Sequence, residues 1–298
     1  MRKKLTAVLL AATMLLTSGV TVFADRVDAV IDKPYLALGA DLSPQEQMTV
    51  LSLLGLSDIN VDDYDIISIT NADEHEYLDK YLDASIIGTR ALSSVLVVGK
   101  EAGNGIHVTT KNISYCTEGM YRNALLTAGI EDADITVAGP FSISGTAALV
   151  GAIKAYETMT GEEIDDENLD AANDELVLTG KLVEDIGDSE KAEDLMALVK
   201  QEVAENKLTS AEDIQNVVDQ ACHQLDIQLS EENQKQIAEL MKKIEGLDLD
   251  VDKLKDQAKD LYQKLEDLDF HVDKESVGNF FTRIIDAIVN FFQGLFGK

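Results

Sequence analysis

Few side chains in this 298-residue sequence have the type and spacing of a catalytic or metal site. The nearest approach is His75-Glu76-Tyr77-Leu78-Asp79. A helix would place His75 and Asp79 on one face, as two zinc ligands are placed, with Glu76 available as a general base. Asp79 stands where such a motif has its second histidine, and the sequence indicates no third ligand. An exposed helical turn therefore explains this stretch better than a metal site does.

Two polar clusters could hold an anion or supply a nucleophile. Gly88-Thr89-Arg90 and Ser93-Ser94 lie where a strand is expected to begin, and Ser142-Ile143-Ser144-Gly145-Thr146 opens an expected helix. The free N–H groups of a helix start favour anions. Turn chemistry and helix capping explain both clusters more simply. One interpretation, an extracellular hydrolase, would place its site around His75, Glu76, Arg90 and Ser144.

Other motifs are absent or incomplete. The sequence contains no G-x-S-x-G elbow, no P-loop and no G-x-G-x-x-G, so we predict no cofactor. Asp248, Asp250 and Asp252 resemble the start of a calcium loop, but Lys253 replaces its glycine and Lys259 replaces its bidentate glutamate. The formal net charge of −30 argues against nucleic acid, because phosphate binding requires Lys and Arg. Loose binding of divalent cations is a further alternative.

The N-terminus predicts export. Arg2-Lys3-Lys4 precedes an apolar run from Leu5 to Val20, and Val22-Phe23-Ala24 is a small-x-small cleavage site. This is the pattern of a secretory signal peptide over residues 1–24, and it is short for a membrane span. We therefore expect a secreted or cell-envelope-associated protein. In that compartment Cys116 and Cys222 could pair, although an apolar helical face around Cys222 favours a buried thiol.

Residues 25–160 are predicted to form an α+β domain. From Asp65 onward the expected order is strand, helix, strand, strand, helix, strand, helix, with a hairpin at Asn104-Gly105 between the adjacent strands. This order matches a ferredoxin-like split β-α-β layout, with a doubly wound sheet as the alternative. The expected helices begin at Ser43, Asn71, Thr117 and Gly145, and the expected strands cover Asp65–Thr70, Ala91–Val98, Ile106–Ile113 and Asp134–Ala138.

A change in composition marks a boundary at residues 161–189, where acidic residues dominate. We expect an exposed joint or a pair of solvated helices there, with a short strand over Leu176–Thr179. Residues 190–298 read as helices throughout. Apolar residues recur every three or four positions from Ile237 to Leu268, which is a heptad seam. The seam predicts either a helical bundle within the chain or a coiled coil that forms a homo-oligomer, with a break at Gly246.

The amphipathic tail, residues 277–296, is the candidate contact surface. Its apolar side could lie in the plane of a membrane surface or dock on an envelope protein. Polar residues such as Arg283 and Asp286 interrupt it, so it is not expected to span a bilayer. The alternative is that this side packs on the preceding helices. The predicted contact residues are Phe280, Phe281, Ile284, Ile285, Ile288, Phe291, Phe292 and Phe296.

Several short motifs resemble one known family. They are Leu38-Gly39-Ala40-Asp41-Leu42-Ser43, Glu74-His75-Glu76-Tyr77-Leu78, Ile87-Gly88-Thr89-Arg90-Ala91-Leu92-Ser93-Ser94 and Ser144-Gly145-Thr146-Ala147-Ala148-Leu149. With the signal peptide, they resemble the YpuA-like family of secreted Firmicute proteins, a domain of unknown function. The resemblance implies an extracytoplasmic location in a Gram-positive bacterium and implies no activity or cofactor. Together with the residues, it favours a non-enzymatic binding or scaffold module.

Overall fold

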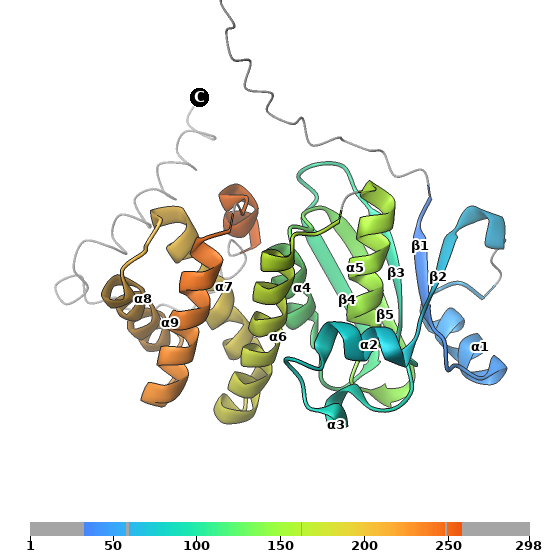
Figure 1. The fold of residues 1–298 in the computed structure, drawn as a ribbon, viewed down its shortest axis with the longest axis horizontal. Coiled ribbons are helices and arrows are strands. Elements are labelled where there is room, and N and C mark those ends of the chain that lie inside the picture. The colour runs from blue at the N-terminus through green and yellow to red at the C-terminus, as the bar shows by residue number, and fades with distance from the viewer. Residues whose placement is uncertain (1–32, 58–59, 162, 248, 258–298) are drawn as a thin grey trace, which may run out of the picture.

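The computed structural model of the protein describes residues 33–57, 60–161, 163–247 and 249–257. A five-stranded mixed sheet with its covering helices is followed by a group of further helices (Figure 1). The predicted combination of a mixed α and β part with a helical part is confirmed at this level. The elements are β1 (Tyr35–Gly39), α1 (Pro44–Leu53), η1 (Val61–Asp63), β2 (Asp65–Ile69), α2 (Asn71–Leu78), α3 (Ala84–Ile87), β3 (Ser94–Gly99), β4 (Ile106–Ile113), α4 (Glu118–Thr127), β5 (Ala133–Ile143), α5 (Thr146–Thr160), α6 (Asp166–Ile186), α7 (Ser189–Asn206), α8 (Ala211–Gln224) and α9 (Glu231–Glu245).

The sheet has the strand order β2-β1-β3-β5-β4. Strands β1 and β2 run parallel, and so do β4 and β5. Strand β3 lies between these pairs and is antiparallel to both β1 and β5. The sheet therefore consists of two strand–helix–strand units, β1-α1-β2 and β4-α4-β5, joined through β3.

This order is not the predicted ferredoxin-like one, and the predicted hairpin is wrong. Strand β5 lies between β3 and β4, and β1, which was not predicted, lies between β2 and β3. The loop at Asn104-Gly105 is bound to the start of β5 instead of closing a hairpin. The Gly105 N–H donates to Asp132 Oδ1 at 2.6 Å, and the Lys100 N–H donates to the Asp132 carbonyl at 3.1 Å.

Helices cover both faces of the sheet. Val50 and Leu54 of α1 pack with Leu36 and Ala138 on one face. Helices α2, α4 and α5 bury their apolar residues in a larger core on the other face. Helix α5 approaches β1 closely at Gly151, where an added Cβ would lie 2.8 Å from Ala37 Cβ. A larger residue at that position would force the helix away from the sheet.

The helices α6 to α9 share a second apolar core. The stretch predicted as an acidic joint, residues 161–189, is mostly the 21-residue helix α6, and Leu176–Thr179 is helical instead of a strand. Leu178 and Leu182 of α6 lie in the second core, whereas Leu176 lies in the core of the sheet. Helix α6 therefore belongs to both cores. Its acidic composition reflects one solvated side of a packed helix.

The heptad seam is divided between the two cores. In α9, Ile237, Leu240 and Ile244 are buried among the chain's own helices. Helix α9 ends at Glu245, and a new helical turn covers residues 251–257. Leu254 in this turn is buried in the core of the sheet. The described part of the seam therefore packs inside one chain and is not a continuous coiled coil, because α9 ends at Glu245 and the two helical parts pack in different cores.

Some predictions fall outside the described residues. They are the signal peptide, the seam beyond residue 257 and the whole amphipathic tail, including its eight predicted contact residues. Across the part of the chain that the structure does describe, no helix is sufficiently long and apolar to cross a membrane. Cys116 and Cys222 are free thiols buried in different cores.

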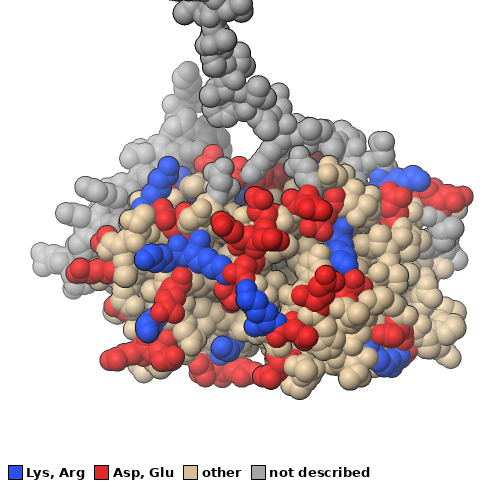
Figure 2. Space-filling model, viewed as in Figure 1, with Lys and Arg blue, Asp and Glu red and all other residues tan. Residues whose placement is uncertain are grey.

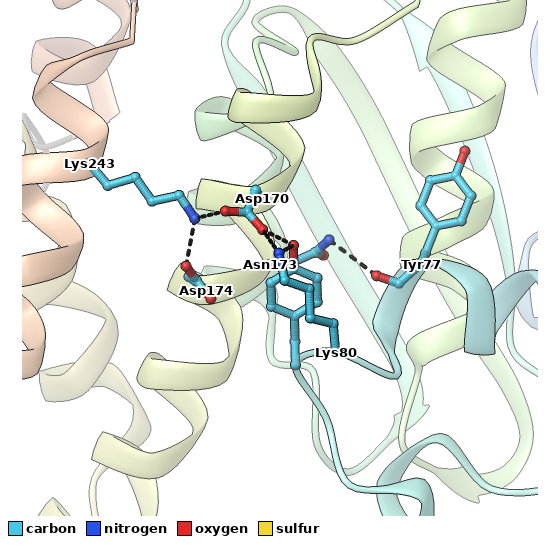
Figure 3. Close-up of polar contacts among 7 residues, drawn as sticks. Tyr77, Lys80, Asp170, Asn173, Asp174 and Lys243 are labelled. Carbon is cyan, nitrogen blue, oxygen red and sulfur yellow. Dashed lines mark hydrogen bonds and ion pairs between the residues drawn. The ribbon is translucent and has the colours of Figure 1, made fainter.

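A cluster of polar side chains ties the end of α2 to the helical part. Asp170 of α6 accepts from Lys80 Nζ at 2.6 Å, from the Tyr81 hydroxyl and from Lys243 Nζ of α9 (Figure 3). Lys243 also contacts Asp174 Oδ2 at 2.6 Å. We call these five residues the Asp170 cluster. Because α2 is one wall of the pocket described below, the cluster fixes that wall against α6 and α9.

We predict that Asp170→Asn lowers the free energy of unfolding by about 1–2 kcal/mol at pH 7. Hydrogen bonds from Lys243, Lys80 and Tyr81 hold the pKa of Asp170 well below its ordinary value. The stabilisation is therefore complete above the unfolded-state pKa of about 3.9 and is lost as the pH falls through the folded-state pKa. Urea unfolding should show a smaller difference between parent and variant at pH 3 than at pH 7.

Asp174→Asn is the matched control, because it removes the same charge but only one contact, to Lys243. Its effect at pH 7 should be smaller than that of Asp170→Asn. A difference between the parent and Asp170→Asn that stays constant from pH 7 to pH 3 would contradict the role assigned to this carboxylate.

Candidate functional site

A pocket of about 460 Å³ opens where α2, α3, the start of β3 and the start of α5 meet. This volume lies in the range of small-molecule sites. The lining combines hydroxyl groups, one carboxyl, one guanidinium and several apolar side chains. The lining residues are Glu74, Ser85, Ile86, Ile87, Gly88, Thr89, Arg90, Leu92, Ser93, Ser114, Tyr115, Phe141, Ile143, Ser144 and Thr146.

Three side chains form a hydrogen-bonded chain at the base of this pocket. The Thr146 hydroxyl donates to Glu74 Oε1 at 2.7 Å, and Ser144 Oγ lies 3.2 Å from Thr146 Oγ1. Asn71 Nδ2 donates to the other carboxyl oxygen of Glu74 at 3.1 Å. Glu74 is only 1% exposed, so these partners take the place of water around its carboxyl group. We call Glu74, Thr146 and Ser144 the Glu74 chain.

Local signals position both ends of the Glu74 chain. Thr70 caps α2 in a capping box with Asp73, which fixes the register of the helix and turns Glu74 inward. Helix α5 starts after Gly145, whose φ of 100° favours glycine. The Tyr121 hydroxyl donates to the Gly145 carbonyl at 2.5 Å, and an added Cβ at Gly145 would lie 2.7 Å from that hydroxyl. Glycine is therefore required for Ser144 and Thr146 to face the pocket.

Burial controls the protonation of the groups near the base. It raises the pKa of Glu74, while the hydrogen bonds from Thr146 and Asn71 oppose that effect. Burial also raises the pKa of the Cys116 thiol to about 12 and that of the Tyr121 hydroxyl well above its ordinary value. Cys116 therefore stays a thiol at neutral pH and is not a nucleophile there. Of these three groups, only Glu74 has an ordinary pKa below neutrality, and the hydrogen bonds from Thr146 and Asn71 favour its ionised form.

The direction of the hydrogen bonds follows from that carboxylate. An ionised carboxylate only accepts, so the Thr146 hydroxyl hydrogen is committed to Glu74. The Ser144 hydroxyl then donates to Thr146, since Thr146 has no second hydroxyl hydrogen to offer. The remaining lone pairs of Ser144 Oγ are left as acceptors. The base of the pocket is therefore suited to a ligand group that donates hydrogen bonds.

Arg90 is the cation at the rim of the pocket, and it is already paired with Glu46. Arg90 Nη2 donates to the Asp41 carbonyl at 2.8 Å and to Glu46 Oε2 at 3.0 Å. Asp41 Oδ2 accepts from the Ala91 N–H at 2.8 Å, which fixes the loop that carries Arg90. Phe141, 49% exposed, provides an apolar wall of the pocket.

The structure brings together two of the four residues proposed for a polar site. Arg90 and Ser144 line the same pocket, but His75 and Glu76 do not. His75 Nδ1 lies 2.5 Å from Asp79 Oδ1 along α2, and Glu76 is exposed. Among the described residues, no group of three or more His, Cys, Asp or Glu side chains could hold a metal ion.

Sequence reasoning missed Glu74, which lies one position before His75 and is the carboxyl that does reach the pocket. One signal could have identified it. Leu78, four residues later, is the apolar residue of this helix that belongs in a core, and residues four apart share a helix face. Asn71, three residues earlier, lies on the same side and contacts Glu74.

Comparison with known proteins gives a family without an assigned activity. Residues 38–261 match the family described as "Protein of unknown function (DUF1002)". The chain is 39% identical over 296 residues to "Uncharacterized protein YpuA" of Bacillus subtilis (strain 168), a match that covers 98% of this chain and 100% of that protein. No solved structure matches. The resemblance inferred from the motifs is confirmed: the chain belongs to the DUF1002 family of unknown function.

Proposed function

We propose that this protein is a secreted or cell-envelope-associated binding module whose ligand site is the pocket at the start of α5. The observation that carries the proposal is the Glu74 chain, which ends in free acceptor positions on Ser144 Oγ inside a partly apolar pocket. A pocket with apolar walls, a few convergent polar groups and a buried titratable residue is the usual form of a small-molecule site. The ligand is a small polar molecule that donates hydrogen bonds.

The location rests on the sequence. The basic start, the apolar run and the site at Val22-Phe23-Ala24 support export. The amphipathic residues 277–296 support attachment to a membrane surface or to an envelope protein. Self-association through the heptad seam would have to use its later part, because Ile237 and Ile244 already face the chain's own core.

A screen of small water-soluble fragments by ligand-observed NMR tests the site. Ser144→Trp would fill the pocket, so fragments that bind the parent protein should lose their signal changes with this variant. Ser142→Trp is the matched control, because Ser142 is an exposed residue two positions away that does not line the pocket. Fragments that bind the parent and Ser144→Trp equally would place the ligand site elsewhere and overturn the proposal.

Removal of residues 276–298 tests the attachment. If the tail attaches the protein to the envelope, the truncated protein should move to the medium and its melting temperature should change little. A sharp fall of the melting temperature with unchanged location would instead mean that the tail packs on the fold.

The Glu74 chain also favours one second candidate, an extracellular hydrolase with Ser144 as the nucleophile. On attack, the Ser144 proton would pass to Thr146 while the Thr146 proton passes to Glu74. Binding is the better-supported function, because no histidine is among the described residues that line the pocket. Turnover of chromogenic ester, glycoside or peptide substrates that disappears in Ser144→Ala would support the hydrolase. Absence of turnover, or turnover unchanged in Ser144→Ala, would remove it.

A further inference from the structure

The hydrogen-bonded chain at the base of the pocket ends in the Glu74 carboxyl group, which points to the class of its ligand. We infer, on the basis of the proposed function, that the ligand carries a protonated primary amine. Its ammonium group donates to Ser144 Oγ, and the Glu74 carboxylate is its counter-ion through the Thr146 hydroxyl. The aromatic walls of Phe141 and Tyr115 cover the rest of the ligand.

The balance of charge supports a cation. Glu74 is a buried carboxyl at the base of the pocket, and the guanidinium of Arg90 is already neutralised by Glu46. Burial is the main cause that raises the pKa of Glu74, and among the neighbouring charges His75 lowers this pKa while Asp41 raises it. The chain as a whole carries a net charge of −30, and Asp and Glu are spread across the face seen in Figure 2. This field attracts cations and repels anions.

An anion is the main alternative, since a helix start and an arginine both lie at this pocket. One N–H at the positive end of α5 is already used by a protein group, however. The Ala148 N–H donates to Ser93 Oγ at 2.9 Å, and the Thr146 side chain is bound to Glu74. An anion at this position would lie beside the Glu74 carboxylate, and like charges in a partly buried site repel strongly. Arg90 would also have to leave Glu46 to reach it.

The polar base and the aromatic walls of the pocket suit an amine with an apolar part. The ring of Tyr115 is held against α6, because an added Cβ at Gly180 would lie 2.5 Å from its hydroxyl oxygen. Phe141 offers an exposed ring on β5. The two rings offer apolar surface to the rest of the ligand. A charge-assisted hydrogen bond to Ser144 is stronger than a neutral one, and an alcohol of the same shape would make only the neutral bond.

Matched pairs of probes test the inference on the full secreted chain. The pairs are n-butylammonium with n-butanol, and glucosamine with glucose, and binding is followed by protein-observed NMR. We expect at least one ammonium probe to bind about tenfold more tightly than its neutral partner. The difference should disappear in Glu74→Gln and fall in Ser144→Ala. Glu76→Gln should retain it, because Glu76 lies on the same helix but outside the pocket.

Each outcome of the probe experiment either supports or overturns the ammonium inference. Equal binding of the charged and neutral members would overturn the ammonium inference while leaving the pocket as a binding site. Binding of inorganic phosphate at this pocket in preference to every ammonium probe would also overturn it. If no probe shifts the pocket signals, the inference is wrong, and the fragment screen with Ser144→Trp then decides the proposed function separately. If Glu74→Gln does not fold, Ser144→Ala provides the test, because Ser144 is only partly buried.

Discussion

Replacing Lys200 with Met is expected to lower the free energy of unfolding by about 3–5 kcal/mol. Lys200 on α7 is fully buried, and so is Glu175 on α6. Lys200 Nζ lies 3.0 Å from Glu175 Oε1, and it donates to the Asn123 carbonyl at 3.0 Å and to Thr127 Oγ1 at 3.1 Å. Because Asn123 and Thr127 belong to α4, this one ammonium group joins three helices. Removing it leaves the Glu175 carboxylate buried without its counter-charge.

The double variant Lys200→Met with Glu175→Leu separates the cost of an unpaired charge from the value of the pair. We expect the double variant to be more stable than Lys200→Met alone, because neither charge is then buried without a partner. Urea unfolding followed by circular dichroism measures all three proteins. Lys235→Met is the control, since Lys235 and Glu239 form an exposed pair, and its effect should stay below about 0.5 kcal/mol. A loss below about 1 kcal/mol for Lys200→Met would show that water solvates this pair.

Most predictions that depend on local sequence agree with the structure, although α2 is capped by Thr70 and not by the expected Asn71. Ser43 was the predicted start of α1, and the structure shows it as the cap in a complete capping box with Glu46. Thr117 caps α4 as expected, and Ser230 caps α9. These signals involve side chains that bond to N–H groups three residues away, so the sequence itself contains both partners.

Predictions that depend on distant partners failed. The loop turns at Ala102-Gly103 and not at Asn104-Gly105, and it closes no hairpin, because Asp132, 27 residues beyond Gly105, binds the loop to β5. The acidic composition of residues 161–189 indicated an exposed joint or a pair of solvated helices, because nothing near Glu175 in the sequence shows that Lys200 will pair with it in the interior. Charged residues indicate a surface only when their partners are also at the surface.

For the candidate site too, local sequence signals were informative and predictions that depend on distant partners failed. Arg90 and Ser144 were singled out because each lies beside the expected start of an element, and the structure places both in the lining of one pocket. Arg90 and Ser144 come together because strand β3 lies next to β5. The predicted strand order did not place these two strands side by side. Glu74 was missed because the neighbouring His75 has the more reactive side chain. The packing of Leu78 in the core determines which face of α2 points to the pocket, and Glu74 lies on that face.

Replacing Leu254 with Ala is expected to lower the free energy of unfolding by about 2–5 kcal/mol, which is the second large effect. Leu254 is 1% exposed and packs in the core of the sheet, beyond the break at Gly246. Lys253, its neighbour, is held by Asp132 Oδ2 at 2.5 Å in a contact that is mostly shielded from water. These contacts predict that residues 251–257 stabilise the α/β part of the same chain.

Val251→Ala is the matched control. Because Val251 is only partly buried, this substitution should lower the free energy of unfolding less than Leu254→Ala does. In a coiled coil, Val251 and Leu254 would occupy the two core positions of one heptad, so both substitutions would weaken it and the stability would rise with protein concentration. Packing within one chain predicts unequal losses and the same unfolding midpoint over a hundredfold dilution. Equal losses with a midpoint that depends on concentration would mean that the seam joins two chains, and that Leu254 serves the partner instead of its own sheet.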